Sequence, residues 1–377
     1  MNINNTLSKF FRDTPIVFCR DGKTNERLKA DIITFLKVKE SNFDSKFQQA
    51  IKQSRQLIKC HGKEPLYHHI DELYEVEEAN RVLTEKRDKR DHVIHALNTF
   101  LLGIYINNKY LGNGVDMFQW KVAALFHDIA YPLEIAQEII ERYFKIISEI
   151  KEKLDVETYT ATLNLIPKDI DKLTHNKSAF DLIQRRVYEW GLDVNVKKRY
   201  DDMIKEDFEK PQKTSENTTK VYKEETITRS KSKSSKDNKL CHGILSSLTV
   251  LYLIDLMYQK NNPLRDNRSH NGWKQKNFEK DIVSACSAIF LHNLGDDAFG
   301  NIDKTKAQLA YLLKLSDGLQ EWDRPKKKMS EGDSPENYDI QGEQNKLIFN
   351  VSNQGIKDQI ESNIKCLKDN SISIKII

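Results

Sequence analysis

Histidine and aspartate residues recur inside or beside the apolar helical segments of this 377-residue chain. The run WKVAALFHDIAYP ends near His127 and Asp128, two adjacent polar side chains that need partners if the helix is buried. Upstream, RDHVIHALNTFLLGIYI places His92 and His95 three positions apart, on one face of a helix. A fold that buries these segments must bring polar side chains together in its interior, where a shared metal ion would satisfy them.

Three further candidates lie in apolar segments nearer the C-terminus. His242 opens HGILSSLTVLYL, His292 closes IVSACSAIFLH, and Asp317 lies within YLLKLSDGLQEWDRP. Imidazoles and carboxylates that face one core form a mixed nitrogen and oxygen site, which suits iron, manganese, cobalt or zinc. A lone His-Asp pair would be weak support, because about one arises by chance in a chain this long. The recurrence predicts a divalent-metal site.

The hydrophobic pattern predicts a mainly α fold with a small α+β appendage at the C-terminus. Helical periodicity is found at residues 91–107, 117–130, 135–154, 240–257, 282–291 and 306–322. In the tail, residues 346–351 and 371–377 alternate as strands do, with a helical stretch at 356–367 between them. One more strand is predicted at residues 15–19, within a mixed helical region.

Three regions are predicted along the chain: an N-terminal region of unassigned role (1–84), a helical core (85–325), and a linker with the appendage (326–377). Residues 209–239 nearly lack core-forming side chains and are rich in Lys, Ser, Thr and Glu. Such a segment cannot bury enough apolar surface to offset the entropy of ordering. Apolar residues resume directly after it, so we interpret it as a flexible insertion within one helical domain.

Net charge, cysteine spacing and hydropathy indicate which partners and which cellular compartment to expect. Sixty Lys and Arg against 56 Asp and Glu give a net charge of +4, too small to predict a nucleic-acid surface from composition. The five cysteines have no C-x-x-C spacing, which favours reduced thiols. The N-terminus lacks a signal-peptide pattern, and the most apolar stretch, residues 243–258, is shorter than a membrane span. We therefore expect a cytoplasmic protein that contacts no membrane.

In their order and local context these residues resemble the HD-domain superfamily of metal-dependent phosphohydrolases. The signature of that superfamily is a His, a His-Asp pair and a later Asp, with two more His in its two-metal members. The local sequences are also similar: R-D-H-x-x-H at 90–95, A-L-F-H-D-I at 124–129, H-G-I-L-S-S at 242–247 and D-G-L-Q-E-W at 317–322. One departure is Ala96, where many relatives have a small hydroxyl residue.

The resemblance implies a helical core that holds two divalent ions, with Mn, Fe, Co, Zn and Mg all open. The first ion would be bound by His95, His127, Asp128 and Asp317. His242 and His292 would complete a second site that shares Asp128. His127 and Asp128 would then lie at a catalytic centre where a metal-bound hydroxide attacks phosphorus. The implied substrate is a small-molecule phosphate ester or anhydride, with a nucleotide favoured.

Substrate contacts are predicted at His92, Lys121 and Arg324. His92 either contacts substrate or is merely the residue one turn from a ligand. Arg324 is a better phosphate partner than the lysine run at 326–328, because its guanidinium pairs bidentately. That run is more often a solvated face.

Two other functions stay open. An HD-type nuclease acting on single-stranded nucleic acid is less favoured, although the lysine-rich insertion would help it. A non-catalytic module for ligand sensing or protein interaction is the third possibility. The oligomeric state does not follow from the sequence.

Overall fold

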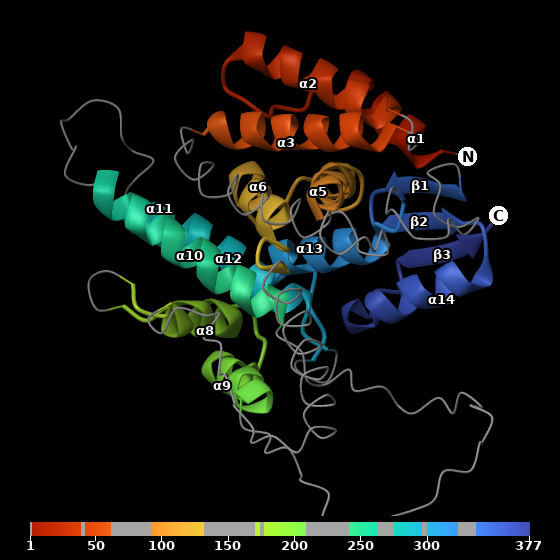
Figure 1. Cartoon of the computed structure of the whole chain (residues 1–377). Helices are drawn as coiled ribbons and strands as arrows, with labels where there is room; N and C mark the ends of the chain where they lie inside the picture. Colours follow the sequence, from red (N-terminus) through yellow and green to blue (C-terminus); the bar gives the residue numbers. More distant parts are fainter. Residues whose placement is uncertain are drawn as a thin grey trace, which may run out of the picture.

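The structure, a computed structural model, describes residues 2–38, 42–61, 92–131, 170–173, 177–208, 241–261, 275–295, 300–322 and 337–377. Its elements are α1 (Ile3–Asp13), α2 (Gly22–Lys37), α3 (Phe43–Lys59), α5 (His92–Lys109), α6 (Met117–Phe126), α8 (Ala179–Glu189), α9 (Val196–Phe208), α10 (His242–Asn261), α11 (Gln275–Asn277), the π-helix η4 (Phe278–Ile282), α12 (Val283–His292), α13 (Gln308–Leu319), β1 (Tyr338–Glu343), β2 (Lys346–Val351), α14 (Gln354–Asn363), the 3-10 helix η6 (Lys365–Leu367) and β3 (Ile372–Ile376). The predicted fold class, mainly α with a small α+β appendage, is confirmed (Figure 1).

Helices α5, α6, α10, α12 and α13 pack together at the centre of the molecule. Helix α12 contacts α6, α10 and α13, and α5 contacts α6 and α13. All ten residues of α12 are buried, as is α5 from His92 to Asn107. A helix that is apolar on all sides requires neighbours on all sides. Polar side chains in the fully buried stretches of α5 and α12 therefore point into the protein interior.

Helices α1, α2 and α3 form a layer over α5 and α6, and α8 packs on α12 at the other side (Figure 1). The strand predicted at residues 15–19 is wrong, because this segment joins α1 to α2 without pairing to a strand. The amides of Phe18 and Cys19 donate to Oδ1 of Asn25, which in turn donates through Nδ2 to the carbonyl of Ile16. A side chain of α2 thus satisfies backbone groups that a neighbouring strand would otherwise satisfy.

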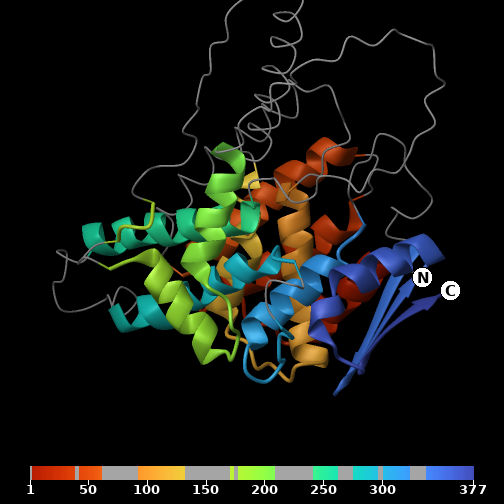
Figure 2. The ribbon, with the colours of Figure 1, turned by 90° about the horizontal axis from the view of Figure 1, so that it is seen from below.

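The C-terminal sheet has the order β1-β2-β3, with β1 antiparallel and β3 parallel to β2. The predicted strand at 346–351 is confirmed as β2, and α14 provides the crossover that a parallel pair requires. Strand β1 was not predicted, because only its first three residues are buried and it lacks full alternation. Thr6 Oγ1 donates to Asp339 Oδ1 at 2.6 Å, so α1 is joined to β1, and both termini lie beside the sheet (Figures 1 and 2).

Buried apolar side chains from α1 to β3 form one continuous cluster. The predicted insertion at 209–239 and the predicted helix at 135–154 lie outside the described residues, and the predicted boundaries at 84 and 326 stay predictions. Within the part of the chain that the structure describes, no helix has the length and apolarity needed to cross a membrane.

Candidate metal centre

Seven polar side chains converge where the central helices meet. They are His92 and His95 of α5, His127 and Asp128 at the end of α6, His242 at the start of α10, His292 at the end of α12, and Asp317 in the last turn of α13. The predicted helix at 117–130 is shorter than expected, because α6 ends at Phe126 and His127 is its C-cap. Because α6 ends before His127, the side chains of His127 and Asp128 turn toward the other residues of the cluster.

Three groups of these side chains could hold a metal ion, because their ligand atoms lie within 4.8 Å of one another. The groups are His95, His127 and Asp128; His127, His292 and Asp317; and Asp128, His242 and His292. The structure therefore brings together all six metal ligands that the sequence predicted. Asp128, His127 and His292 each belong to two of the groups, and Asp128 is the only carboxylate among these three.

The two carboxylate oxygens of Asp128 face different imidazoles. Oδ2 lies 2.8 Å from Nδ1 of His92, 3.5 Å from Nε2 of His127 and 3.7 Å from Nε2 of His95. Oδ1 lies 3.3 Å from Nε2 of His242 and 3.4 Å from Nε2 of His292. Asp128 therefore stands between two sets of nitrogen donors.

Asp317 adds a second carboxylate to the first set. Its Oδ1 lies 2.9 Å from Nε2 of His95 and 3.6 Å from Nε2 of His127. The two Nε2 atoms of His95 and His127 are 3.2 Å apart. Two imidazoles and two carboxylates thus surround one small volume.

Hydrogen bonds at two helix ends fix the imidazoles of His127 and His292. Nδ1 of His127 donates to the carbonyl of Ala124 at 2.9 Å, and Nδ1 of His292 donates to that of Ile289 at 2.6 Å. Each carbonyl belongs to the last turn of a helix, where backbone oxygens lack helical partners. A carbonyl only accepts, so Nδ1 carries the hydrogen, and each ring in its neutral form would present the Nε2 lone pair to the centre.

Gln320 has the same effect on His95, and the sequence prediction missed it. Its side-chain oxygen accepts from Nδ1 of His95, and its amide nitrogen donates to the carbonyl of Trp322. The second bond orients the amide, so the oxygen faces the imidazole. No local pattern marks Gln320, because it is the C-cap of α13 with an extended backbone and its partner His95 is 225 positions away.

Replacing Gln320 with leucine should lower the affinity for divalent metal by roughly 10- to 100-fold, because His95 loses the acceptor that holds its Nε2 toward the centre. Gln320→Glu keeps an acceptor for Nδ1 of His95 but loses the donor to the Trp322 carbonyl, so its metal affinity should lie between those of Gln320→Leu and the wild type. Competition titrations of chelator-treated protein with zinc or manganese would measure both. Equal affinities for Gln320→Leu and the wild type would contradict this role.

His242 is held differently from the other imidazoles. Nδ2 of Asn293 lies 3.3 Å from its Nδ1, so Nε2 carries the hydrogen toward Asp128. Turning the Asn293 amide over by half a turn would offer an oxygen to Nδ1 and free Nε2 for a metal. Gly243 permits this close packing, since a Cβ there would lie 2.9 Å from Cε1 of His292 and 3.0 Å from Cβ of Asn293.

The cluster keeps its two carboxylates ionised in the protein interior. Burial acts to raise the pKa of Asp128 and of Asp317, but the surrounding imidazoles, first among them His127, hold both well below the ordinary value. Burial acts to lower the pKa of His127, but Asp128 and Asp317 outweigh it and raise that pKa. For His292 burial prevails and the pKa is lowered. Anionic oxygens and a neutral imidazole are the forms that bind cations.

His92 lies beside the candidate ligands without joining any of the three groups. Its ring is buried, with Nδ1 2.8 Å from Oδ2 of Asp128. The ring of Tyr131 lies over it, with centroids 3.7 Å apart. His92 is therefore a partner of Asp128, and its contact with substrate stays a prediction.

Lys121 lies away from the cluster. Its Nζ donates to the carbonyls of Phe18 at 2.6 Å and Leu57 at 3.0 Å, and lies 2.8 Å from Nε2 of His61. These partners belong to the N-terminal layer, where the side chain is fully buried. This placement argues against the predicted role of Lys121 in substrate binding. Arg324 and the lysine run at 326–328 lie outside the described residues.

The buried lysine should make stability depend on pH. Burial lowers the pKa of Lys121 to about 8 from 10.5. Between these values the unfolded chain keeps a proton that the folded protein has released, so the free energy of unfolding rises with pH. Lys121→Met has no titrating group at this position. From about pH 8 to about pH 10 the free energy of unfolding of the wild type should therefore rise by roughly 1–3 kcal/mol relative to that of Lys121→Met. Urea unfolding at both pH values measures this, and a constant difference would contradict it.

No family model, curated protein or solved structure matches this chain. The imidazoles and carboxylates of the cluster, most of them buried, could hold a metal ion. Neither the number nor the identity of the ions follows from these positions.

Proposed function

We propose that this chain is a metal-dependent phosphohydrolase of the HD-domain type. It cleaves a phosphate ester or anhydride of a nucleotide or a related small molecule. The observation that carries the proposal is the position of Asp128, whose two oxygens face separate sets of imidazoles. A carboxylate placed in this way suits a bridge between two cations.

The donor set fits two divalent ions. His95, His127, Asp128 and Asp317 would hold the first, and Asp128, His242 and His292 the second. Mixed imidazole and carboxylate ligands suit manganese, iron, cobalt or zinc, while magnesium prefers oxygen. When bound, such ions polarise phosphoryl oxygens and provide an activated water at neutral pH.

The chain's own residues orient and insulate this centre. Gln320 holds the ring of His95, and the last-turn carbonyls of α6 and α12 hold those of His127 and His292. His92 hydrogen-bonds Asp128 and fixes the plane of its carboxylate. Fixed partners of this kind keep ligands in position before metal or substrate arrives. The buried surroundings also strengthen electrostatic interactions with a phosphate group.

The decisive experiment compares two histidine variants. His127→Ala should lose bound metal and reduce hydrolysis to background, because one imidazole of the first set is gone. His61→Ala removes an imidazole of the N-terminal layer and should keep both properties. Elemental analysis and a panel of nucleotides, cyclic nucleotides and phosphomonoesters with added manganese provide the readouts. Metal-dependent hydrolysis that survives in His127→Ala would refute the proposal.

The same panel separates the other two functions. Hydrolysis of single-stranded nucleic acid that falls steeply with salt would indicate a nuclease, because phosphate contacts release counterions. Stoichiometric metal without turnover on any substrate would indicate a non-catalytic module. Salt-tolerant hydrolysis of a small phosphate compound supports the proposed function.

A further inference from the structure

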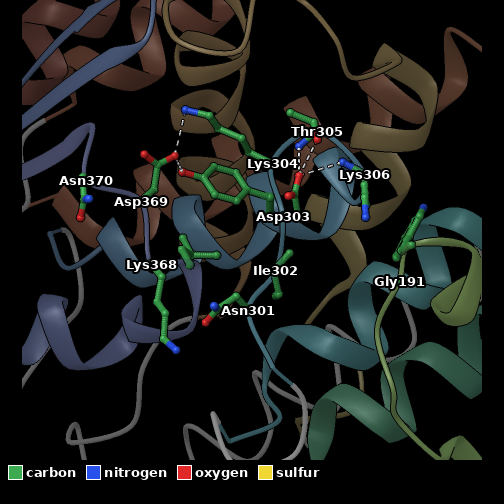
Figure 3. Close-up of a pocket in the computed structure, with 13 residues that line it drawn as sticks. Gly191, Asn301, Ile302, Asp303, Lys304, Thr305, Lys306, Lys368, Asp369 and Asn370 are labelled. Carbon is green, nitrogen blue, oxygen red and sulfur yellow. Dashed lines mark hydrogen bonds and ion pairs between the residues drawn. The ribbon is translucent and has the colours of Figure 1, made fainter.

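A second polar pocket lies outside the His/Asp cluster, and none of the residues that line it belongs to that cluster (Figure 3). Three regions distant in sequence form it: the turn after α8, the loop before α13 together with Tyr311 of that helix, and the end of η6 with the loop before β3. Its volume is about 510 Å³, in the range of sites for small molecules. Trp190 from the first segment adds an indole ring to a lining that is otherwise rich in polar groups.

A fixed ion pair occupies one wall of this pocket. Nζ of Lys304 lies 3.1 Å from Oδ2 of Asp369, which also accepts from the hydroxyls of Tyr110 at 2.6 Å and Tyr311 at 2.8 Å. Burial opposes ionisation of Asp369, but hydrogen bonds from Ser371 and Tyr110 outweigh it and lower its pKa. The negative charge of Asp369 is thus satisfied by the protein's own donors.

The second carboxylate of the pocket is also satisfied internally. Oδ1 of Asp303 accepts from the amide of Thr305 at 2.7 Å, from its hydroxyl at 2.6 Å and from the amide of Lys306 at 3.2 Å. These bonds close the turn before α13 and leave this oxygen little capacity to bind a cation. A metal ion is therefore a poor match for the pocket.

Positive charge is in excess at the rim. The side chains of Lys306 and Lys368 are exposed there, and neither makes an ion pair with any residue that the structure describes. Lys368 has a left-handed backbone (φ 42°), which side-chain-bearing residues seldom adopt. The amides of Asn301 and Asn370 add neutral hydrogen-bond donors to the same rim.

We propose that this pocket binds a small phosphorylated molecule. Its phosphate oxygens accept from Lys306 and Lys368, and its remaining part lies against Trp190. Ammonium groups on opposite segments form charge-assisted hydrogen bonds with phosphate. The ion pair of Lys304 and Asp369 joins the loop before α13 to the loop before β3 and holds the two lysine-bearing segments together.

Calorimetric titration with inorganic pyrophosphate tests the proposal on the full chain. The protein carries His127→Ala and is treated with chelator, so that phosphate cannot bind through metal. In this background the double variant Lys306→Gln/Lys368→Gln should bind pyrophosphate at least about tenfold more weakly, because two charge-assisted contacts are lost.

A matched control removes two lysines of the sheet. Lys346→Gln/Lys375→Gln changes the net charge equally, outside the pocket lining, and should bind as the parent does. Equal affinity in all three proteins, or no binding by the parent, would overturn the proposal. Because no metal is present, the result does not depend on the function proposed for the His/Asp cluster.

Discussion

If the cluster binds two ions as proposed, Asp128→Ala should lose both, whereas His242→Ala should lose only one. Oδ2 of Asp128 faces His95 and His127, and Oδ1 faces His242 and His292. Removing this side chain takes a ligand from each set and leaves buried imidazoles without a counter-charge. Removing His242 takes a ligand from the second set alone. Hydrolysis should fall to background in Asp128→Ala, since both ions of a two-metal site act on the same phosphate.

Elemental analysis of purified protein gives the ion count directly. Wild type should hold about two ions per chain, Asp128→Ala close to none and His242→Ala about one. Asp31→Ala removes a half-buried carboxylate from α2 and should keep the wild-type count. Circular dichroism establishes that each variant keeps its helices. A single ion in wild type, or equal counts in the two cluster variants, would refute the bridging role of Asp128.

Gly103→Ala should destabilise the protein strongly and weaken metal binding with it. A Cβ at Gly103 would lie 1.9 Å from Cζ2 of Trp120. That indole cannot easily move, because it is buried and its Nε1 donates to the carbonyl of Phe100 at 3.0 Å. Helices α5 and α6 would have to separate, which costs about 1–3 kcal/mol or more for overpacking of this kind. The same helices carry His95 and His127, so their imidazoles would move apart.

Gly22→Ala is the matched control for this substitution. Gly22 begins α2, and a Cβ there meets nothing within 4 Å. This variant should be as stable as wild type or slightly more so, because alanine restricts the unfolded chain. Thermal unfolding of the two variants, followed by metal titration, measures both effects. A Gly103→Ala protein as stable as Gly22→Ala would show that α5 and α6 accommodate the added methyl group.

Secondary structure was predictable where local pattern and burial agree. The helices that carry the cluster are apolar around most of their circumference, so the sequence marked them clearly. The prediction failed where one side chain replaces a neighbouring strand and where the buried part of a strand is short. Asn25 satisfies the backbone of residues 16–19 in place of a strand, and the buried half of β1 is too short to give an alternating pattern.

The candidate metal centre, like the secondary structure, was predictable only in part. Its six candidate ligands were predicted because polar residues in apolar helices are conspicuous in a sequence. Gln320 and the true surroundings of Lys121 were not predicted, because both depend on contacts between distant segments. Gln320 is separated from His95 by 225 positions, and Lys121 from Phe18 by 103.

The sequence by itself determined which helices enter the interior, because helices that are apolar on most sides are buried together with most of the imidazoles and carboxylates that they carry. Only the tertiary structure decided how these groups are divided around Asp128, that Gln320 orients the ring of His95, and that Lys121 contacts the N-terminal layer. These properties depend on helix ends, packing angles and hydrogen bonds across the chain. No local pattern encodes them, because each requires the positions of at least two elements at once.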